Sequence, residues 1–581
     1  MSKGALFIAG LVLALAAGQC SAAEWNVADA GAVGDGITDN TAVFQKLLKA
    51  AEDAGGGIVN VPTGKFRING NLIIPGGVTL QGTYRTAPQA ADLRGSVLLA
   101  YAGRGSYEGK PFIALGGPAA TVAGLIITYP EWKQTDVPPV PYPPCIGMNG
   151  GADNVSIIDC GILNAYEAIN LTLAGRHLVR NVTGYPSWRG LYVDQCYDIG
   201  RIENVHFWPF GVIYKADDPY CKWVNLNGVA FEFSRTDWQY VTNTFCFGYG
   251  VGYKFSGSKS GSCNGSFLSI GADSCERAVL VEQSQTPGLL ITNGEFVGRW
   301  GGTGSIAVDI SERNAGKVSL SNCSFWGPIS NCVRMRSSEC QFTAIGCNFC
   351  DWDAKNIDLP AIQLDAGSAI IQGNSFGEGS SHVSVGSKVR SAIIVGNQSA
   401  ENFSVENHAG NRTQLVANHA VTSNLTNKEK ANYRIKVGSS GDSEYLKHWY
   451  HCELADGDAT LRWSGVASRL VLPVVPGKAY DLVLKVYVPS YALQSDAGLY
   501  VDGKAIAKIK KGGTYIISSK IPATKSDAVT VKVRCKGWSP SIVTPGNTDN
   551  RNLGVQLFWV RMKAKDAGTQ VFDANTNVWM K

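Results

Sequence analysis

Three aspartates are the residues of this sequence best suited to acid–base chemistry. Asp194, Asp217 and Asp218 are the candidate catalytic carboxyls, with Asp198 and Glu131 in reserve. A pair of carboxyl groups can cleave a glycosidic bond when one is protonated and the other activates water. Because Asp217 and Asp218 are adjacent, their mutual repulsion is expected to raise the pKa of one of them, as a general acid requires.

Aromatic side chains are concentrated in the same part of the chain. Residues 129–256 contain 5 of the 14 tryptophans and 11 of the 22 tyrosines. Sugar rings stack on aromatic planes, and their hydroxyls need charged or amide partners. The residues predicted to bind such a substrate are Trp132, Trp188, Arg189, Tyr192, Trp208 and Lys215.

A repeat of about 22 to 28 residues between positions 154 and 410 indicates what positions these side chains. Each repeat begins with an alternating strand that closes on asparagine, as at Asn181, Asn204 and Asn322, and a second alternating strand follows roughly ten residues later. Short strands, small turns and recurrent asparagine predict a right-handed parallel β-helix, in which the stacked asparagines form a ladder at one corner. Residues 224–263 are long for one repeat, and a loop of about 15 extra residues is expected there.

Strand alternation places Leu191 and Val193 in the core and turns Tyr192 and Asp194 outward. If residues 211–214 form the equivalent strand of the next coil, Lys215 lies above Asp194. The backbones of Asp194 and Asp217 are then about 8 Å apart, from one coil spacing and two strand residues. Inverting glycosidases separate their carboxyls by about 6.5–9.5 Å, so this spacing favours inversion.

The stretch Gly34-Asp35-Gly36-Ile37-Thr38-Asp39-Asn40-Thr41 precedes a helical pattern in which Val43, Leu47 and Ala50 share a face and Asp39 or Asn40 can cap. A helix there would close the open end of the solenoid. Together with Gly56-Gly57-Ile58-Val59-Asn60-Val61-Pro62, the stretch resembles the entry segment of the pectate-lyase superfamily and of secreted β-helical proteins related to glycoside hydrolase family 28. This resemblance implies the fold over residues 24–410. Of the polygalacturonase motifs, only an Asp217-Asp218 pair remains.

The domain organisation follows from these patterns. We expect a signal peptide at residues 1–23, a catalytic β-helix at 24–415, a linker at 416–432, an antiparallel, jelly-roll-like β-sandwich at 433–565 and a tail at 566–581. The signal predicts a secreted or periplasmic protein. A lipid anchor at Cys20 is the alternative, although Gln19 precedes it where a small residue is expected. Signal cleavage leaves 14 cysteines, expected to be buried small side chains or local bridges.

Composition and motif content exclude several classes of binding partner and cofactor. With 52 Lys and Arg against 47 Asp and Glu, the net charge is only +5 and no basic run is present, so nucleic acid is not expected. No apolar run beyond the signal is long enough for a membrane span. No nucleotide loop, zinc motif or nucleophile elbow occurs, so no organic cofactor is indicated. The oligomeric state is left open.

The predicted function is therefore hydrolysis of a polysaccharide or oligosaccharide. Two alternatives stay open. A polysaccharide lyase would use Lys215 or Arg189 as its base, with Ca²⁺ neutralising a uronate. The Ca²⁺ ligands would be Asp194, Asp198, Asp217 and Asp218. The second alternative is a glycan-binding or adhesion solenoid without enzymatic activity.

Overall fold

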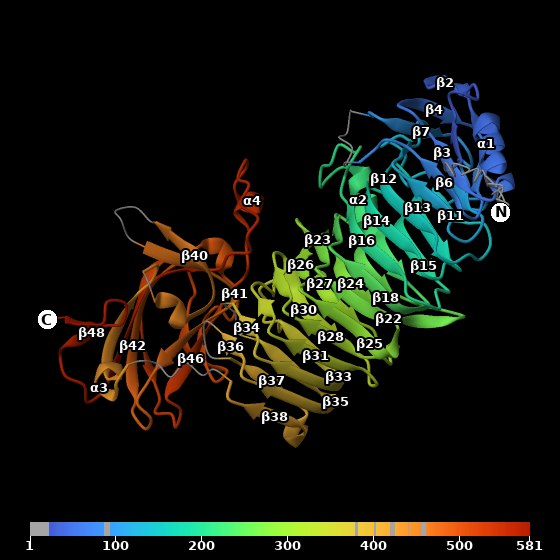
Figure 1. Cartoon of the computed structure of the whole chain (residues 1–581). Helices are drawn as coiled ribbons and strands as arrows, with labels where there is room; N and C mark the ends of the chain where they lie inside the picture. The colour runs from blue at the N-terminus through green and yellow to red at the C-terminus, as the bar shows by residue number, and fades with distance from the viewer. Residues whose placement is uncertain are drawn as a thin grey trace, which may run out of the picture.

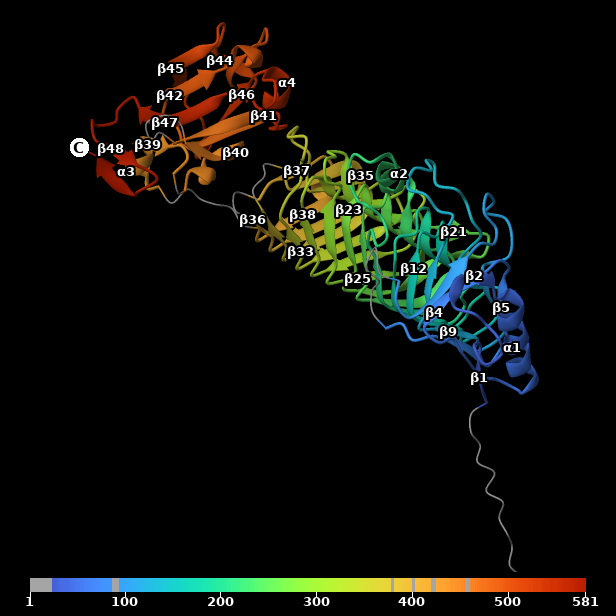
Figure 2. The same cartoon turned by 90° about the horizontal axis from the view of Figure 1, so that it is seen from above.

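The computed structural model describes residues 23–85, 93–377, 381–399, 403–418, 425–439, 441–454 and 460–580. All but the last residue of the predicted signal peptide lies outside these ranges. The described chain forms a parallel β-helix followed by a mostly antiparallel C-terminal domain, which confirms the predicted fold class (Figure 1). Figure 2 shows an elongated molecule, with helix α1 (Thr41–Asp53) at one end and the C-terminal domain at the other.

Each coil contributes strands to three parallel sheets, called here the first, second and third sheet. The first sheet carries the strands on which the predicted site was placed. Its members are β5 (Leu72–Ile74), β8 (Ile113–Leu115), β11 (Ile146–Met148), β13 (Glu167–Thr172), β15 (Arg189–Asp194), β17 (Val229–Phe233), β20 (Val251–Phe255), β24 (Arg277–Val281), β27 (Ser305–Ile310), β30 (Ile329–Met335), the first parts of β33 (Ile362–Gln372) and β35 (Val383–Val395), and β37 (Val405–Asn407).

The second and third sheets share several long strands. The second sheet comprises β1 (Glu24–Asn26), β3 (Gly57–Asn60), β6 (Val78–Gln81), β9 (Thr121–Ala123), the first parts of β12 (Ser156–Leu163), β14 (Leu178–Gly184) and β16 (Arg201–Phe207), then β18 (Thr236–Thr242), β22 (Gly261–Leu268), β25 (Ser284–Thr292), β28 (Val318–Ser321), β31 (Gln341–Ile345), the ends of β33 and β35, and β38 (Thr413–Val416). The third comprises β2 (Asp35–Asp39), β4 (Gly64–Ile68), β7 (Ser96–Ala100), β10 (Ile126–Thr128), the ends of β12, β14 and β16, then β19 (Phe245–Phe247), β23 (Gly271–Cys275), β26 (Glu295–Gly298), β29 (Ser324–Trp326), β32 (Asn348–Phe349), β34 (Ser375–Phe376) and β36 (Gln398–Ser399). Strand β21 (Gly257–Ser258) forms a small antiparallel hairpin with β22.

The core contains the inward rows that strand alternation predicts. Ile169, Leu191 and Val279 are fully buried and belong to one hydrophobic cluster that runs through the solenoid. Helix α1 covers the first coils with Phe44, Leu47, Leu48 and Ala51. The predicted helix is therefore present, with Leu47 buried and Val43 packed half-buried against the core, whereas Ala50 is half-buried and outside the core cluster. Asn40 is its N-cap residue but makes no side-chain cap bond, because its amide side chain bonds Val33 and Thr38.

The predicted asparagine ladder is present at the corner between the second and third sheets. Asn204 donates to Asn181 and Asn322 donates to Asn293, each at 2.8 Å. These residues have a left-handed backbone, with φ of 52° at Asn322. Asparagine tolerates this conformation better than most residues and also satisfies the amide of the next coil.

The coil after β15 differs from the prediction. Residues 211–214 form no strand, and Val224–Asn227, expected to be a repeat strand, lies in helix α2 (Pro219–Asn227). The chain returns to the first sheet only at β17, and β17, β18 and β19 form a regular coil before β20 begins the next one. The insertion therefore spans about residues 208–228 rather than 224–263.

All 14 cysteines of the described chain are free thiols, so none of them forms the local bridge that the sequence allowed. Twelve are buried, Cys350 is half-buried and Cys452 is exposed. Most therefore act as small core side chains.

No helix of the described residues has the length and apolar character needed to cross a membrane.

The C-terminal domain has its own hydrophobic core. Its strands are β39 (Asn432–Lys436), β40 (Leu446–Leu454), β41 (Thr460–Pro473), β42 (Tyr480–Val488), β43 (Gly498–Val501), β44 (Lys504–Lys508), β45 (Gly513–Ile521), β46 (Ala528–Arg534), β47 (Gln556–Ala564), β48 (Val571–Asp573) and β49 (Val578–Met580). They pair antiparallel except for β39 with β48. Short helices α3 (Asn427–Lys430) and α4 (Pro540–Val543) and 3-10 turns at Gly410–Arg412, Asp442–Glu444 and Ser490–Ala492 complete the chain. Strands β48 and β49 occupy the segment that the sequence suggested was a tail.

The ladder supports a stability prediction at Asn322. Asn322→Ala removes the amide bond and places alanine at a positive φ, so we expect the free energy of unfolding to fall by about 1–3 kcal/mol. Asn322→Gly also loses the amide bond, but glycine adopts a positive φ without strain. The free energy of unfolding should therefore fall less than in Asn322→Ala. Urea denaturation of both variants measures this, and equal losses would show that the backbone conformation contributes nothing.

Candidate active site

Asp194 lies on the outer side of β15 but is committed to local structure. Its Oδ1 accepts hydrogen bonds from the backbone N–H of Arg235 at 3.0 Å, the N–H of Gln195 at 2.9 Å and the hydroxyl of Ser258 at 2.9 Å. Only 7% of the residue is exposed. This carboxylate therefore fixes the turns of neighbouring coils and presents little surface to a substrate.

The structure does not stack Asp217 above Asp194. The strand next to β15 is β17, and the residue opposite Tyr192 is Glu232. Asp217 and Lys215 are exposed in the insertion before α2. The predicted spacing of about 8 Å is therefore wrong, because it assumed a strand at 211–214.

Asp218 is the N-cap of α2. Its Oδ1 accepts from the backbone N–H of Tyr220 and of Cys221. Partial burial acts in the opposite direction, but these bonds prevail and lower the pKa of Asp218. The expectation that repulsion would create a protonated acid here is not met.

The reserve residues lie apart from this group. Asp198 accepts from Arg176 at 2.8 Å, and Glu131 is exposed on a loop. The four aspartates suggested for Ca²⁺ each have separate partners or face solvent. Among the described residues, no group of three or more His, Cys, Asp or Glu side chains is placed to hold a metal.

The first sheet instead contains an ion-pair network that the sequence analysis did not predict. We call Glu167, Arg189, Glu232 and Lys254 the arginine network. Arg189 pairs with Glu167 at 2.7 Å and with Glu232 at 3.1 Å, and Lys254 lies 3.3 Å from Glu232. The Glu167 side chain is fully buried. Burial raises the pKa of Glu167 despite Arg189, whereas at Glu232 the cations Lys254 and Arg189 outweigh burial and lower the pKa.

Aromatic rings enclose this network. Trp188 stacks on Tyr166 with ring centroids 5.2 Å apart, and the Arg189 guanidinium lies over the rings of Trp188 and Tyr192. Tyr107 donates to Glu167 at 2.8 Å. A pocket of about 300 Å³ beside the arginine network is lined by residues such as Tyr107 and Asn170. Because the guanidinium fills the space between the two carboxylates, the network is built to stabilise the coils.

The other predicted aromatic residues have different surroundings. Trp132 is half-buried and donates to the Tyr220 hydroxyl at 3.1 Å. Trp208, in contrast, is 42% exposed and lies 6.4 Å from the Phe247 ring on the third sheet. In the next coil, Phe247 is opposite Asp273. Trp208 is therefore the predicted residue that leads to a second carboxylate site.

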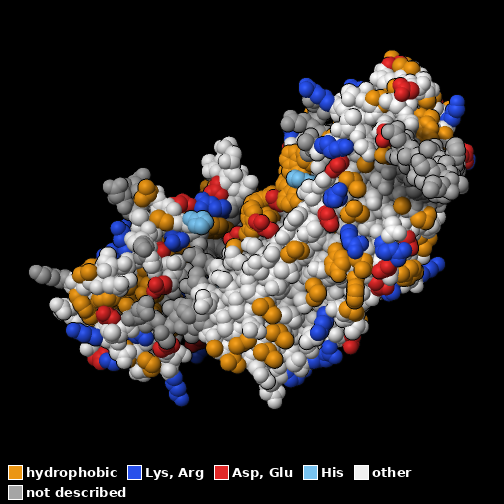
Figure 3. Space-filling view, viewed as in Figure 1, with side chains coloured by type: hydrophobic (Ala, Val, Ile, Leu, Met, Phe, Trp, Pro, Cys, Tyr) orange, Lys and Arg blue, Asp and Glu red, His pale blue; other side chains and the backbone are white. Residues whose placement is uncertain are grey.

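That site is a pair of acids, each held by an indole. Trp300 donates from Nε1 to Asp273 Oδ1, and Trp326 donates from Nε1 to Glu295 Oε1, both at 3.0 Å. The two indole rings pack edge to face with centroids 6.1 Å apart. We call these four residues the indole–carboxylate pair. Figure 3 shows hydrophobic and acidic side chains together along this edge of the solenoid, near β23 and β26.

Register places the two carboxylates on neighbouring coils. Glu295 is opposite Gly271, and Asp273 is two residues further along β23. One coil spacing and two strand residues separate the backbones by about 8 Å. Ala272 and Phe296 face the core, so Asp273 and Glu295 point outward.

The environments of the two acids differ. Asp273 is half-buried, and burial together with the charge of Glu295 raises its pKa, although the Trp300 indole acts in the opposite direction. Glu295 is exposed. Among the described residues neither acid has an ion-pair partner within 4.0 Å, which distinguishes this pair from the arginine network.

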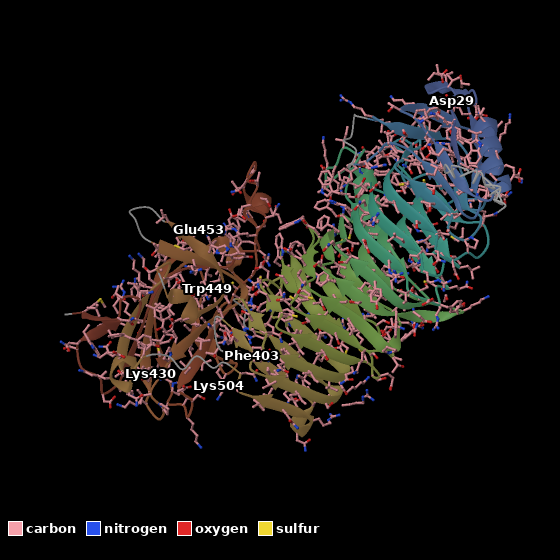
Figure 4. All side chains as sticks on the ribbon, viewed as in Figure 1. Asp29, Phe403, Lys430, Trp449, Glu453 and Lys504 are labelled. Atoms are coloured by element: carbon pink, nitrogen blue, oxygen red, sulfur yellow. The ribbon has the colours of Figure 1, made fainter. Side chains whose placement is uncertain are left out.

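The surface continues from the pair to the C-terminal domain. Trp326 precedes Gly327, whose N–H donates to the exposed Asp351 at 3.0 Å. Asp351 and Trp352 line a cleft of about 330 Å³ together with residues of β40, among them Trp449 and Tyr450. Figure 4 places Trp449 in the C-terminal domain and Phe403 on the last coils of the solenoid.

Comparison with known proteins supports the fold most strongly at the N-terminus. A family model described as rhamnogalacturonase A/epimerase, pectate lyase-like, matches residues 25–107, which confirms the predicted resemblance to the pectate-lyase superfamily. Alginate lyase 7 of Azotobacter vinelandii is 51% identical over 47 residues, 8% of this chain and 6% of that protein. Mannuronan C5-epimerase AlgE4 of the same organism is 41% identical over 66 residues, 10% of this chain and 12% of that protein.

These curated relatives are therefore matched over only a small part of their own length. Among solved structures, the family 28 exopolygalacturonase of Yersinia enterocolitica is 10% identical, with a TM-score of 0.35, over 70% of this chain and 79% of that one. The family match ends at residue 107, far before the indole–carboxylate pair.

The arginine network supports a stability prediction. Arg189→Met leaves the buried Glu167 without its cation, so we expect the free energy of unfolding to fall by about 3–5 kcal/mol. Adding Glu167→Gln removes the uncompensated charge and should recover part of that loss. Chemical denaturation of both variants tests this, and a single variant as stable as the parent would contradict it.

Proposed function

We propose that the protein is a secreted glycoside hydrolase that cleaves a polysaccharide at Asp273 and Glu295. The observation that supports this most directly is the indole–carboxylate pair: two outward acids on neighbouring coils, each bonded to an indole of an aromatic surface. The coarser conclusion, a pectate lyase-like β-helix of a carbohydrate-active family, stands on the family match.

In this proposal Asp273 is the general acid. Its raised pKa, caused by burial and by the charge of Glu295, keeps it protonated to higher pH. Asp273 protonates the leaving oxygen as the glycosidic bond breaks. Glu295 accepts a proton from the water that forms the new bond to the anomeric carbon. With both side chains pointing outward in parallel, the backbone separation of about 8 Å corresponds to the roughly 6.5–9.5 Å between carboxyl groups that leaves room for this water, and inversion is proposed on that basis.

The aromatic surface and its charge indicate the substrate class. Trp208, Phe247, Trp300 and Trp326 offer faces for sugar rings beside the acids. Glu295 and Asp351 give this surface an acidic character, which opposes a polyuronate. We therefore propose a neutral polysaccharide, with the cleft at Trp352 and Tyr450 extending its path onto the C-terminal domain.

A lyase is the second candidate. Alginate lyase 7 matches the N-terminal coils, but a lyase needs a base beside a uronate, and the acidic surface opposes that substrate. A non-enzymatic solenoid would keep the aromatic surface without turnover. Incubating the purified protein with neutral and uronate glycans distinguishes these functions, since a hydrolase releases plain reducing ends and a lyase releases ultraviolet-absorbing unsaturated ends.

Replacing either acid should stop hydrolysis. We expect Asp273→Asn and Glu295→Gln each to lower kcat by about 10²–10⁴-fold, because a positioned acid or base contributes that much, while polysaccharide binding persists. Asp217→Asn is the matched control, since Asp217 is an exposed aspartate of the insertion. Reducing-end release measures turnover. Full activity in both acid variants would refute this site. Loss of activity in the Asp217→Asn control alone would indicate that the catalytic carboxyl lies in the insertion.

The indole of Trp300 should set the alkaline limit of activity. Its N–H stabilises ionised Asp273, so Trp300→Phe removes a bond that lowers the pKa while keeping an aromatic ring. The pKa of Asp273 then rises, and the alkaline limb of the kcat/KM profile should move to higher pH. A limb that moves down or stays in place would argue that Asp273 is not the acid.

A further inference from the structure

A second group of aromatic residues lies at the corner between the first and second sheets. Tyr197 is 55% exposed, Trp238 is 59% exposed and Tyr240 is 45% exposed. Large aromatic side chains are seldom this exposed together unless they meet a ligand. We call Tyr197, Trp238 and the polar residues between them the aromatic corner.

The backbone at this corner is strained. Trp238 has φ of 53° and Ile199 has φ of 25°, values that bulky or β-branched residues rarely adopt. Such a conformation costs about 1–2 kcal/mol per residue. Asn264, which is buried, holds Trp238 in place by accepting its N–H at 3.1 Å. Positive φ recurs at the turns of this solenoid, often at asparagine, and at Trp238 it fixes the direction of an exposed indole.

The two aromatic residues border a shallow pocket of about 290 Å³, whose polar lining is Asp198, Asp237 and Asn264. Asp198 pairs with Arg176 at 2.8 Å, and Asp237 pairs with Arg235 at 2.8 Å. The carboxylates keep lone pairs for hydroxyl donors, while Arg235 and Arg176, which also pairs with Asp153, offset part of their charge. This chemistry suits an uncharged, hydroxyl-rich ligand better than an anion.

We propose that the aromatic corner is a second polysaccharide-binding site, which holds a neutral glycan chain without cleaving it. The indole–carboxylate pair lies on the outer face of the third sheet, whereas the corner joins the other two sheets, so the sites occupy different sides of the coil. Asp198, a reserve catalytic candidate, thereby becomes part of a binding floor. The corner would retain the protein on an insoluble or long substrate.

The test compares binding with turnover. Trp238→Asn removes the ring but keeps a residue that tolerates a positive φ, and Tyr197→Ala removes the second ring. Each variant should weaken binding to neutral polysaccharide by about three- to tenfold, measured by affinity electrophoresis. Hydrolysis of short soluble oligosaccharides should not change. Tyr487→Ala, at an exposed tyrosine on β42 of the C-terminal domain, is the matched control.

The outcomes separate this proposal from the catalytic one. Binding is measured in the Asp273→Asn background as well, so that it does not depend on turnover. If the parent hydrolyses nothing but the corner variants still lose binding, the corner stands and the catalytic assignment fails. If the folded double variant binds polysaccharide as well as the parent, or if the parent binds no neutral polysaccharide in the panel, the proposal is overturned.

Discussion

In-register hydrogen bonding between successive parallel coils is the constraint on which the rest of this structure depends. It places residues 21 to 42 positions apart in the chain opposite one another, as at Tyr192 and Glu232 or Phe247 and Asp273. Strand alternation then assigns each row to the core or to the surface. The buried charges, the asparagine ladder and the surface acids are all rows created by this stacking.

Much of the fold could be predicted because its signals are local. Only a few neighbouring residues are needed to recognise the alternation at Leu191 and Val193. The same holds for the asparagine that closes the first strand of each repeat. The antiparallel C-terminal strands, such as Tyr480–Val488, were equally clear. These patterns reflect strand period and turn conformation, which the sequence carries directly.

The site was less predictable because it depends on register. Val224–Asn227 resembles a repeat strand but follows a proline and the capping Asp218, which start a helix. Residues 211–214 were also assigned to a strand that is absent, and this second error placed Asp217 above Asp194. Asp273 and Glu295 are 22 residues apart, close to the 24 residues between the paired positions Gly271 and Glu295, and this spacing was the available signal. Trp300, the partner of Asp273, lies just after β26, and Trp326, the partner of Glu295, is the last residue of β29. Because each indole lies about one coil away from its acid in the sequence, no local motif joins them.

The indole–carboxylate pair and the cleft beside β40 lie along the direction in which coils stack. Duplication of a coil would therefore lengthen the surface by about 4.8 Å without altering the strands on either side. Evolution could then change how many sugar units such a protein accommodates by changing coil number, while the acids that face them stay unmodified. A designer could use the same route to tune chain-length preference.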